Sequence, residues 1–337
     1  MKLSICIATF KRGLFIGQTL ESICAQIEPE VEIVILDGGS PDNTAEVVAG
    51  FVARFPCVRY IRELTNSGID QDYDKAVLNA RGEFCWLMTD DDLLFPGAIS
   101  RLMKALDGPQ DLVIVNASVF DTRLEKVLCD RLLNIQSDRE YGAGEVEEFF
   151  VTAANYLSFI GGVVIRKSAW EVRDRSSYFG TLFIHIGVIF QAPNLSGVAV
   201  IAEPAVMIRY GNAMWTPRSF EIWMFIWPKL VWSFQHFSEH SRALVSAPEP
   251  WRKLKKLGVY RAIGGYSIRE FRIFFQDKFS WRARVLPYLV ARTPGSLANL
   301  TSSIFCLLFF RNKMRLHDLA QSTHSTFLAR MVSRGVR

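Results

Sequence analysis

Apolar runs of strand length alternate with segments of helical spacing over the first third of the chain. The pattern predicts strands at residues 3–8, 31–37, 58–64 and 83–88. In the segments between them, apolar residues recur every three or four positions. This spacing predicts helices at 13–26, 41–55 and 70–82. Strands separated by helices indicate βαβ units, so we expect an α/β fold with a mainly parallel sheet flanked by helices.

The rest of the chain is less regular. It predicts a strand at 111–121, one or two strands at 197–212, and a mostly apolar segment at 178–192 that contains His185. Residues 214–234 are rich in Trp and Phe, and 296–310 form an apolar stretch of 15 residues. Because about 20 apolar residues are needed to span a bilayer, that stretch is too short to cross a membrane. We expect one domain at 1–220 and a helical, basic and aromatic region at 221–337.

The net charge of +5 conceals an uneven distribution. Residues 251–337 hold 17 Lys and Arg against Glu270, Asp277 and Asp318, a net of +14, so residues 1–250 carry −9. A basic region mixed with aromatic residues suits helices that lie on anionic lipid. A helical subdomain that packs on the α/β body with its Arg residues outward is the alternative. Nucleic acid is a less suitable partner, because no DNA- or RNA-binding motif is present.

Cysteine usage and the first residues indicate the compartment. The six cysteines are scattered without a CxxC pair, which is typical of reduced, packed thiols in a cytosolic protein and argues against a zinc site. The N-terminal "MKLSICIATF" has one Lys and a very short apolar run, so it reads as a strand and not as a signal peptide.

Polar residues follow each of the first four predicted strands. Ligands of open α/β sheets bind outside the carboxyl ends of the strands, so these side chains are expected to converge on one edge. They are Thr9, Lys11 and Arg12; Asp37 and Ser40; Asn66, Ser67 and Asp70; and Asp90, Asp91 and Asp92. Neither a Rossmann G-x-G-x-x-G loop nor a Walker A loop is present.

Two acidic features at this edge each allow two interpretations. Three adjacent carboxylates repel one another, and a hard cation held by oxygen atoms would relieve the repulsion; a solvated turn with one Asp capping the next helix is the alternative. Asp37, placed before Gly38 and Gly39, can accept a hydrogen bond from a nucleotide base or ribose. It can equally bond its own turn.

Three stretches, "SICIATFKR", "VEIVILDGGSPDNT" and "NSGIDQDYDKAVLNARGEFCWLMTDDDLLFPGAI", together resemble the nucleotide-sugar-binding half of the family 2 glycosyltransferases. With the later "RYGNAMW" they are most similar to abequosyltransferase-type enzymes that build O-antigen units. The resemblance implies the GT-A fold, a Rossmann-like α/β architecture. The resemblance covers roughly residues 1–220 with decreasing strength, and it does not cover the basic C-terminal region.

The resemblance also implies roles for the residues at the strand ends. Thr9 and Asp37 would hold the base and ribose, and Asp70 and Lys75 would lie near the base or phosphates. Asp90 to Asp92 would form a DxD-type element that holds Mg²⁺ or Mn²⁺. Aligned on Pro96 of the common "DxDDxxxP" pattern, Thr89 replaces the first Asp, so Asp91 is the expected metal ligand and catalytic carboxylate. Asp92 is then a second ligand and Asp90 faces the sugar or ribose.

Two further departures from the family concern recognition and catalysis. "DGGS" replaces the commoner "DDGS", so Gly38 removes a carboxylate. The family usually supplies an Asp as the base that takes the acceptor proton, and the corresponding stretch offers His185; a core histidine bonded to backbone is the alternative. Trp215 and Arg218 would stack on the acceptor sugar and contact the diphosphate, with simple packing as the alternative for Trp215. The "QxxRW" motif of processive synthases is missing, which favours single-sugar transfer.

The function expected from the sequence is transfer of one hexose or deoxyhexose from a nucleotide diphosphate sugar to a lipid-linked saccharide. The enzyme would be cytoplasmic and peripheral, with its basic region on the anionic inner face of the cell membrane. A sugar-1-phosphate nucleotidylyltransferase and a non-catalytic, membrane-associated nucleotide-sugar-binding module are the alternatives.

Overall fold

The computed structural model describes residues 1–309 and 312–335 and divides the chain into two units. The first comprises Met1–Tyr210 and Phe234–Val245, and the second comprises 211–233 and the chain from Ser246 onward. The continuous part of the first unit therefore ends ten residues before the expected boundary at 220. The later segment 234–245 also belongs to the first unit.

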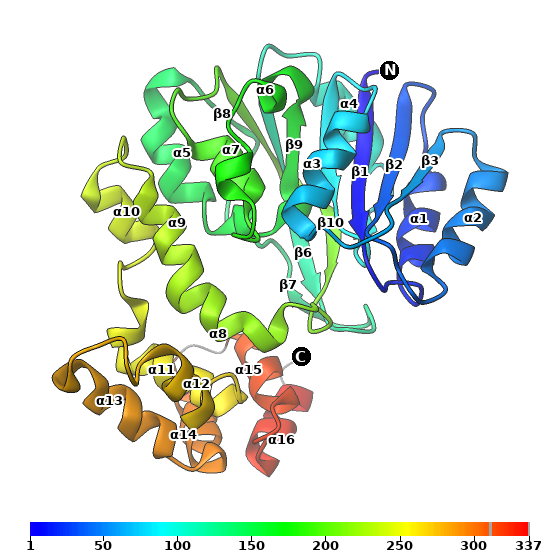
Figure 1. The fold of residues 1–337 in the computed structure, drawn as a ribbon. Coiled ribbons are helices and arrows are strands. Elements are labelled where there is room, and N and C mark those ends of the chain that lie inside the picture. The colour runs from blue at the N-terminus through cyan, green and yellow to red at the C-terminus, as the bar shows by residue number, and fades with distance from the viewer. Residues whose placement is uncertain (310–311, 336–337) are drawn as a thin grey trace. The chain divides into compact units, whose positions relative to one another are not determined.

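A ten-stranded sheet forms the centre of the first unit (Figure 1). Its strand order is β3-β2-β1-β4-β9-β6-β10-β5, with β7 beside β6 and β8 beside β10. The strands are β1 (Leu3–Thr9), β2 (Val31–Asp37), β3 (Val58–Arg62), β4 (Phe84–Met88), β5 (Leu93–Leu94), β6 (Leu112–Phe120), β7 (Val127–Cys129), β8 (Arg139–Tyr141), β9 (Val163–Arg166) and β10 (Val198–Arg209).

The first four strands are parallel, as the alternating pattern predicts, and β10 is parallel to β6. β9 runs antiparallel to both β4 and β6, so it joins the two parallel groups into one mixed sheet. The 197–212 segment is a single strand, β10, whose register against β6 shifts around Pro204. Proline lacks the N–H that a regular ladder requires, which accounts for a bulge at this position.

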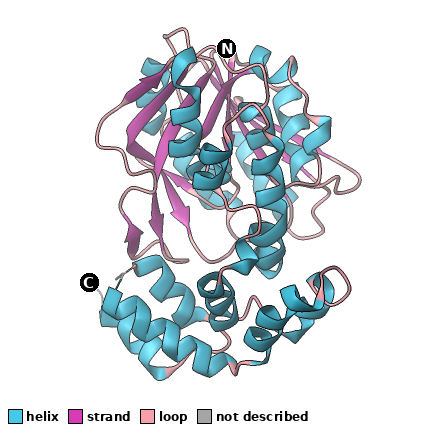
Figure 2. Ribbon diagram, turned by 90° about the vertical axis from the view of Figure 1, so that its left-hand side faces the viewer, coloured by secondary structure: helices cyan, strands magenta, loops and turns pink. Residues whose placement is uncertain are grey.

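Helices cover the sheet of the first unit on both faces (Figure 2). They are α1 (Ile16–Cys24), α2 (Thr44–Arg54), α3 (Ile69–Asn79), α4 (Ala98–Ala105), α5 (Val146–Ala153), α6 (Lys167–Glu171), α7 (Ile184–Phe190) and α10 (Glu239–Val245). Every residue of β1, β2 and β4 is buried. Burial on both faces explains why these strands are continuous apolar runs in the sequence.

Aromatic packing explains why residues 234–245 return to the first unit. Phe237 stacks on Phe150 of α5 with ring centroids 4.1 Å apart, and Phe234 contacts Phe150 and Phe190 edge-on or tilted. Asn155 also donates a hydrogen bond from Nδ2 to the carbonyl of Val245 at 3.1 Å.

The second unit is helical, as expected for the C-terminal region. Phe220, Trp251, Tyr266 and Phe275 form one buried cluster, and Cys306, Leu316 and Leu319 belong to another. Its helices are α8 (Ser219–Glu221), a π-helical segment (Ile222–Ile226), α9 (Trp227–Ser233), α11 (Leu254–Ile263), α12 (Ile268–Phe274), α13 (Trp281–Arg292), α14 (Gly295–Phe309), α15 (Lys313–Gln321) and α16 (Phe327–Gly335). Within 1–309 and 312–335, no helix is both long and apolar enough to cross a membrane.

Candidate active site

The parallel strands bring the predicted polar residues to one edge of the sheet. Thr9 is aligned with Asp37 across β1 and β2, and Ile7 is aligned with Met88 across β1 and β4. The segments after these strands therefore leave the sheet side by side. β6 and β10 run in the same direction as β4, so Arg209 at the end of β10 reaches the same edge.

The acidic run after β4 is buried and paired. Asp90, Asp91 and Asp92 are only 9%, 8% and 3% exposed, which does not fit a solvated turn. The Arg12 guanidinium, from the segment after β1, bridges two of them: Nε lies 3.3 Å from Asp90 Oδ1 and Nη2 lies 3.3 Å from Asp91 Oδ2. A resident cation thus lies beside the carboxylates that the sequence predicts to bind a metal ion.

Arg12 offsets only part of the negative charge at this site. Burial, with a further contribution from the Asp91 charge, raises the pKa of Asp90 to about 7. Arg12 and the Thr9 hydroxyl oppose this rise in pKa. An additional cation would favour the ionised form of Asp90, so the donor set suits a divalent metal.

Asp92 stabilises the acidic turn after β4 by accepting hydrogen bonds. Its Oδ1 accepts the backbone N–H of Arg209 at 2.7 Å, and its Oδ2 accepts the Thr89 hydroxyl at 2.5 Å. Burial raises the pKa of Asp92 well above its usual range. These bonds connect the acidic turn to the end of β10, and they engage both oxygens of a carboxylate that was predicted to bind metal.

Arg209 is a second cation at the site, and its guanidinium holds the acidic turn after β4 by hydrogen bonds. Its Nε donates to the Asp91 carbonyl at 3.0 Å, and its Nη2 donates to Gln18 Oε1 at 2.5 Å. The Phe15 ring lies 5.3 Å from Arg209 Cζ and 5.6 Å from Arg12 Cζ. Arg12 and Arg209 were not assigned roles from the sequence, although both stand inside the quoted stretches "ATFKR" and "RYGNAMW".

Asp37 is completely buried and bonds its own surroundings. Oδ1 accepts the Ser40 N–H at 2.8 Å, Oδ2 accepts the Tyr60 hydroxyl at 2.5 Å, and Arg62 Nε lies 3.9 Å from Oδ2. This is the turn interpretation that the sequence left open. A contact from Asp37 or Thr9 to a nucleotide stays a prediction.

Asp70 and Lys75 lie on α3 and have different surroundings. Asp70 is 4% exposed, and its carboxylate accepts the N–H of Leu182 at 2.9 Å and of Ile184 at 3.0 Å. It therefore holds the segment that leads into α7. Burial raises the pKa of Asp70, and these hydrogen bonds oppose the rise. Lys75 Nζ lies 3.1 Å from both Ser67 Oγ and Glu63 Oε2.

His185 lies in the core at the start of α7. It is 2% exposed, and Nε2 donates to the Leu157 carbonyl at 2.7 Å, which leaves Nδ1 as the unprotonated nitrogen. Within the described residues no hydrogen-bond partner meets Nδ1. Burial lowers the pKa of His185 to about 4, so the imidazole is neutral at physiological pH. This geometry matches the core histidine that the sequence left as an alternative, and the catalytic role stays a prediction.

Trp215 and Arg218 belong to the second unit. Trp215 is 47% exposed and meets Trp223 edge-on, with ring centroids 6.4 Å apart. Arg218 pairs with Glu221, its Nε lying 2.8 Å from Oε2. Both side chains are accessible to a ligand, and their acceptor and diphosphate roles stay predictions.

No three His, Cys, Asp or Glu side chains in residues 1–309 and 312–335 are arranged to hold a metal ion. Mg²⁺ and related ions commonly use one or two carboxylates together with substrate phosphates, so a site completed by a diphosphate needs no such group.

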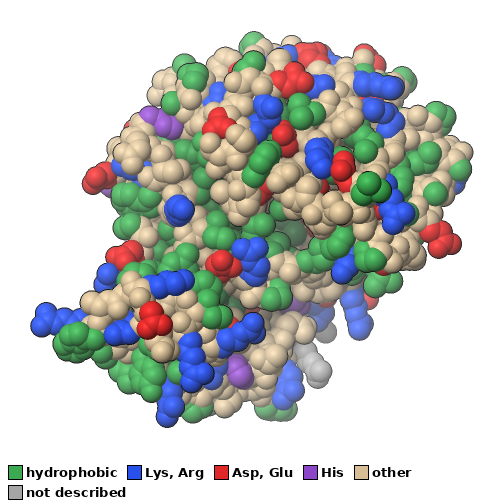
Figure 3. Space-filling model, viewed as in Figure 1, with side chains coloured by type: hydrophobic (Ala, Val, Ile, Leu, Met, Phe, Trp, Pro, Cys, Tyr) green, Lys and Arg blue, Asp and Glu red, His purple; other side chains and the backbone are tan. Residues whose placement is uncertain are grey.

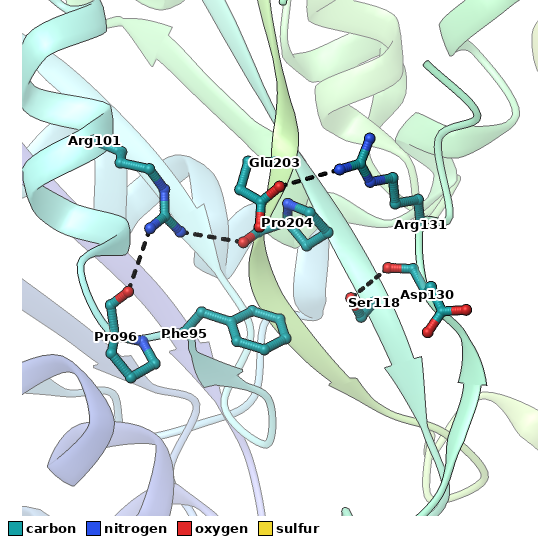
Figure 4. Close-up of a pocket in the computed structure, with 8 residues that line it drawn as sticks. All are labelled: Phe95, Pro96, Arg101, Ser118, Asp130, Arg131, Glu203 and Pro204. Atoms are coloured by element: carbon teal, nitrogen blue, oxygen red, sulfur yellow. Dashed lines mark hydrogen bonds and ion pairs between the residues drawn. The ribbon is translucent and has the colours of Figure 1, made fainter. Parts of the chain in front are cut away.

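A cavity of about 270 Å³ lies beside β6 and β10 (Figure 4). Arg101 donates to the carbonyls of Pro96 and Pro204 at 3.3 and 3.2 Å, and Arg131 pairs with Glu203 at 3.2 Å. Phe95, Ser118 and Asp130 complete the lining, which contains none of the residues predicted for the site.

Comparison with known proteins agrees with this arrangement. Residues 4–150 match the model of Glycosyl transferase family 2. The chain is 28% identical over 226 residues to the abequosyltransferase RfbV of Salmonella typhimurium, covering 63% of this chain and 68% of that protein. It is 32% identical over 109 residues to the GalNAc(5)-diNAcBac-PP-undecaprenol beta-1,3-glucosyltransferase of Campylobacter jejuni, covering 32% of this chain and 35% of that one.

Solved structures share the fold at low sequence identity. S. aureus TarS 1–349 in complex with UDP-GlcNAc matches with a TM-score of 0.55 and 17% identity, covering 99% of this chain and 91% of that one. The mannosyltransferase PcManGT of Pyrobaculum calidifontis, in complex with GDP-Man and Mn²⁺, matches with a TM-score of 0.55 and 14% identity, covering 99% and 87%. The family match over residues 4–150 and the similarity to the abequosyltransferase agree with the resemblance to the family 2 glycosyltransferases, and the solved structures share the fold.

Proposed function

We propose that this glycosyltransferase moves a single hexose or deoxyhexose from a nucleotide diphosphate sugar to a lipid-linked saccharide in surface polysaccharide or O-antigen synthesis. The similarity to an abequosyltransferase and to an enzyme whose name includes an undecaprenol-linked acceptor supports this assignment. The observation that carries it is the buried Asp90–Asp91 pair, which Arg12 bridges without neutralising fully.

Asp91 is the proposed ligand of Mg²⁺ or Mn²⁺, and Asp90 is proposed to face the ribose or sugar. The bound ion would stabilise the charge that develops on the leaving diphosphate. Asp92, also predicted as a ligand, orients the turn through Thr89 and Arg209. Arg12 stands beside the proposed ligand, so its guanidinium can also pair with diphosphate oxygens.

Transfer also requires a group that accepts the proton of the attacking hydroxyl. His185 is the candidate from the sequence, and its Nε2 bond to Leu157 leaves Nδ1 as the basic nitrogen. A pKa of about 4 makes it a weak base. Asp70 would act indirectly, by holding the backbone of Leu182 and Ile184 beside this histidine.

The second unit is proposed to dock on the anionic inner face of the cell membrane, which makes the protein peripheral. Helices α13 and α14 expose large apolar side chains about one turn apart: Trp281, Val285, Tyr288 and Leu289, then Leu297, Leu300, Ile304, Phe305, Leu308 and Phe309. We call these residues the apolar face. An apolar stripe among basic residues is suited to an interfacial helix.

Basic side chains accompany the apolar face. Arg282, Arg284 and Arg292 lie on α13 itself, and Lys255 Nζ lies 5.4 Å from the centre of the Phe305 ring. Figure 3 shows hydrophobic and Lys or Arg side chains side by side over the helices of this unit. Cations within reach of lipid headgroups add attraction to an anionic surface, so charge and apolar exposure support the same partner.

The test of the function is thermal stabilisation by CDP, UDP, GDP and dTDP, each with and without Mn²⁺. A ligand that binds only the folded state raises the melting temperature by mass action. We expect one nucleotide to stabilise the protein in a metal-dependent manner, and Asp91→Ala to abolish the metal dependence. No shift with any of the four would contradict the proposal.

A further inference from the structure

The backbone at Gly38 faces a carboxylate from another element. A Cβ placed on Gly38 would lie 3.0 Å from Asp72 Oδ2 and 3.3 Å from Asn66 Cγ. Contacts this short leave no room for a side chain unless the neighbours shift. The Asp72 carboxylate, supplied by α3, thus stands where the second carboxylate of the commoner "DDGS" sequence would project.

The two neighbouring side chains present opposite hydrogen-bonding groups to this position. Asp72 uses Oδ1 to accept the Ser67 hydroxyl at 2.5 Å, while Oδ2 is its oxygen nearest Gly38. Asn66 uses Oδ1 to accept the Gly68 N–H at 2.7 Å, so its Nδ2, 3.5 Å from the same Cβ position, is the donor left for a ligand. An acceptor and a donor therefore stand together beside a glycine.

Internal contacts hold this pair in place. Asp72 is 3% exposed, and Ser67, which binds it, also receives Lys75 Nζ at 3.1 Å. Gly38 directly follows Asp37 at the end of β2, and its N–H donates to the Thr9 carbonyl at 3.0 Å. The pair consequently lies at the strand-end edge where the nucleotide is proposed to bind.

We propose that Asp72 and Asn66 read the nucleobase of the donor, with Asp72 Oδ2 accepting a base N–H and Asn66 Nδ2 donating to the acceptor atom beside it. This inference rests on the proposed function, because it requires a nucleotide donor. The hydrogen-bonding edge of a nucleobase presents a donor next to an acceptor, which complements this pair. Gly38 does not remove the carboxylate from the site, because α3 supplies it instead.

The experiment measures dissociation constants of CDP, UDP, GDP, dTDP and inorganic pyrophosphate, all with Mn²⁺, for the full chain. Asp72→Asn should weaken the preferred nucleotide about 10- to 100-fold, because a buried acceptor becomes a donor. Binding of pyrophosphate, which has no base, should not change. Asn66→Asp should also weaken that nucleotide, and Asn66 is exposed, so this variant does not disturb the core.

A relocation variant and a matched control separate recognition from stability. Gly38→Asp combined with Asp72→Ala returns the carboxylate to the position directly after β2 and should recover binding that Asp72→Ala alone loses. Asp74→Asn is the same change on the same helix, but its carboxylate accepts Trp170 Nε1 at 2.9 Å and pairs with Arg175, so nucleotide preference should be unaffected.

Unchanged affinity and base preference in both Asp72→Asn and Asn66→Asp would overturn the inference while the proposed function stands. A wild-type protein that binds none of the four nucleotides would overturn the proposed function, and this inference with it.

Discussion

Arg12 Nη2 lies 3.3 Å from Asp91 Oδ2, while Nε of the same guanidinium lies 3.3 Å from Asp90 Oδ1. One cation is thus shared by two buried carboxylates that the sequence places about eighty positions away. Buried charges are tolerated only when they are paired. Arg12 therefore makes the acidic turn stable before any metal or nucleotide arrives.

Arg12→Gln should destabilise the metal-free protein by about 3–5 kcal/mol, because two buried carboxylates lose their partner. Mn²⁺ without nucleotide should raise the melting temperature of this variant more than it raises the melting temperature of the wild type. Thermal melts with and without Mn²⁺ measure both effects, and Arg81→Gln, an exposed position, is the control. Identical melting behaviour of the Arg12 variant and the wild type would contradict the assigned role.

Asp91→Ala and Asp92→Ala should fail in different ways. The first should remove metal-dependent nucleotide binding. The second should cost about 2–5 kcal/mol of stability, because the Arg209 N–H and the Thr89 hydroxyl lose a buried acceptor. Calorimetric binding and urea unfolding separate the two phenotypes. If Asp92→Ala lost as much metal binding as Asp91→Ala and kept the stability of the wild type, Asp92 would instead be a metal ligand.

Stability should depend on the protonation of His185 in acid. Burial lowers its pKa to about 4 in the folded state, whereas an unfolded histidine titrates near ~6.5. The unfolded chain binds the extra proton between these values, so this contribution to stability is present above pH ~6.5 and falls by about 3 kcal/mol as pH drops to about 4. Urea unfolding of His185→Gln should show a weaker decline over this window than the wild type.

The same His185→Gln variant decides the catalytic role. Loss of a general base lowers kcat by about 10²- to 10⁴-fold with nucleotide binding intact. An unchanged kcat would assign His185 to the core alone.

Asp70→Ala should loosen the segment before α7. The N–H groups of Leu182 and Ile184 would lose their acceptor, at a cost of about 1–3 kcal/mol each. Hydrogen exchange at residues 181–184 should accelerate, while exchange in β1 should not. Unchanged exchange at 181–184 would show that other contacts hold this segment.

The apolar face should determine binding to membranes. Ile304→Ser with Leu308→Ser removes two exposed side chains of α14 without touching its buried side. Sedimentation with vesicles that contain anionic lipid should show weaker binding than the wild type, and high salt should weaken both. Val52→Ser with Leu78→Ser, exposed apolar positions of the first unit, is the matched control. Equal sedimentation of the α14 variant and the wild type would count against docking through this face.

Much of the fold could be predicted because it rests on local patterns. Buried strands such as β1 and β4 are continuous apolar runs, and the helices between them repeat apolar positions with helical spacing. The order of the motifs predicted similarity to the family 2 glycosyltransferases, and the family match over residues 4–150 agrees with that prediction. The buried carboxylate run after β4 was found the same way, since polar residues that end an apolar strand are visible in the sequence.

Side-chain partners depended on the tertiary structure. Arg12 meets Asp90 and Asp91, Asp72 faces Gly38, and Arg209 binds Asp92 from 117 positions away. Residues 234–245 return to the first unit through aromatic contacts with α5 and α7. A sequence pattern records the period of an element and hence which face is apolar. It does not record which distant side chain packs against that face, because the pairing of strands and the direction of each side chain are settled only when the whole core closes.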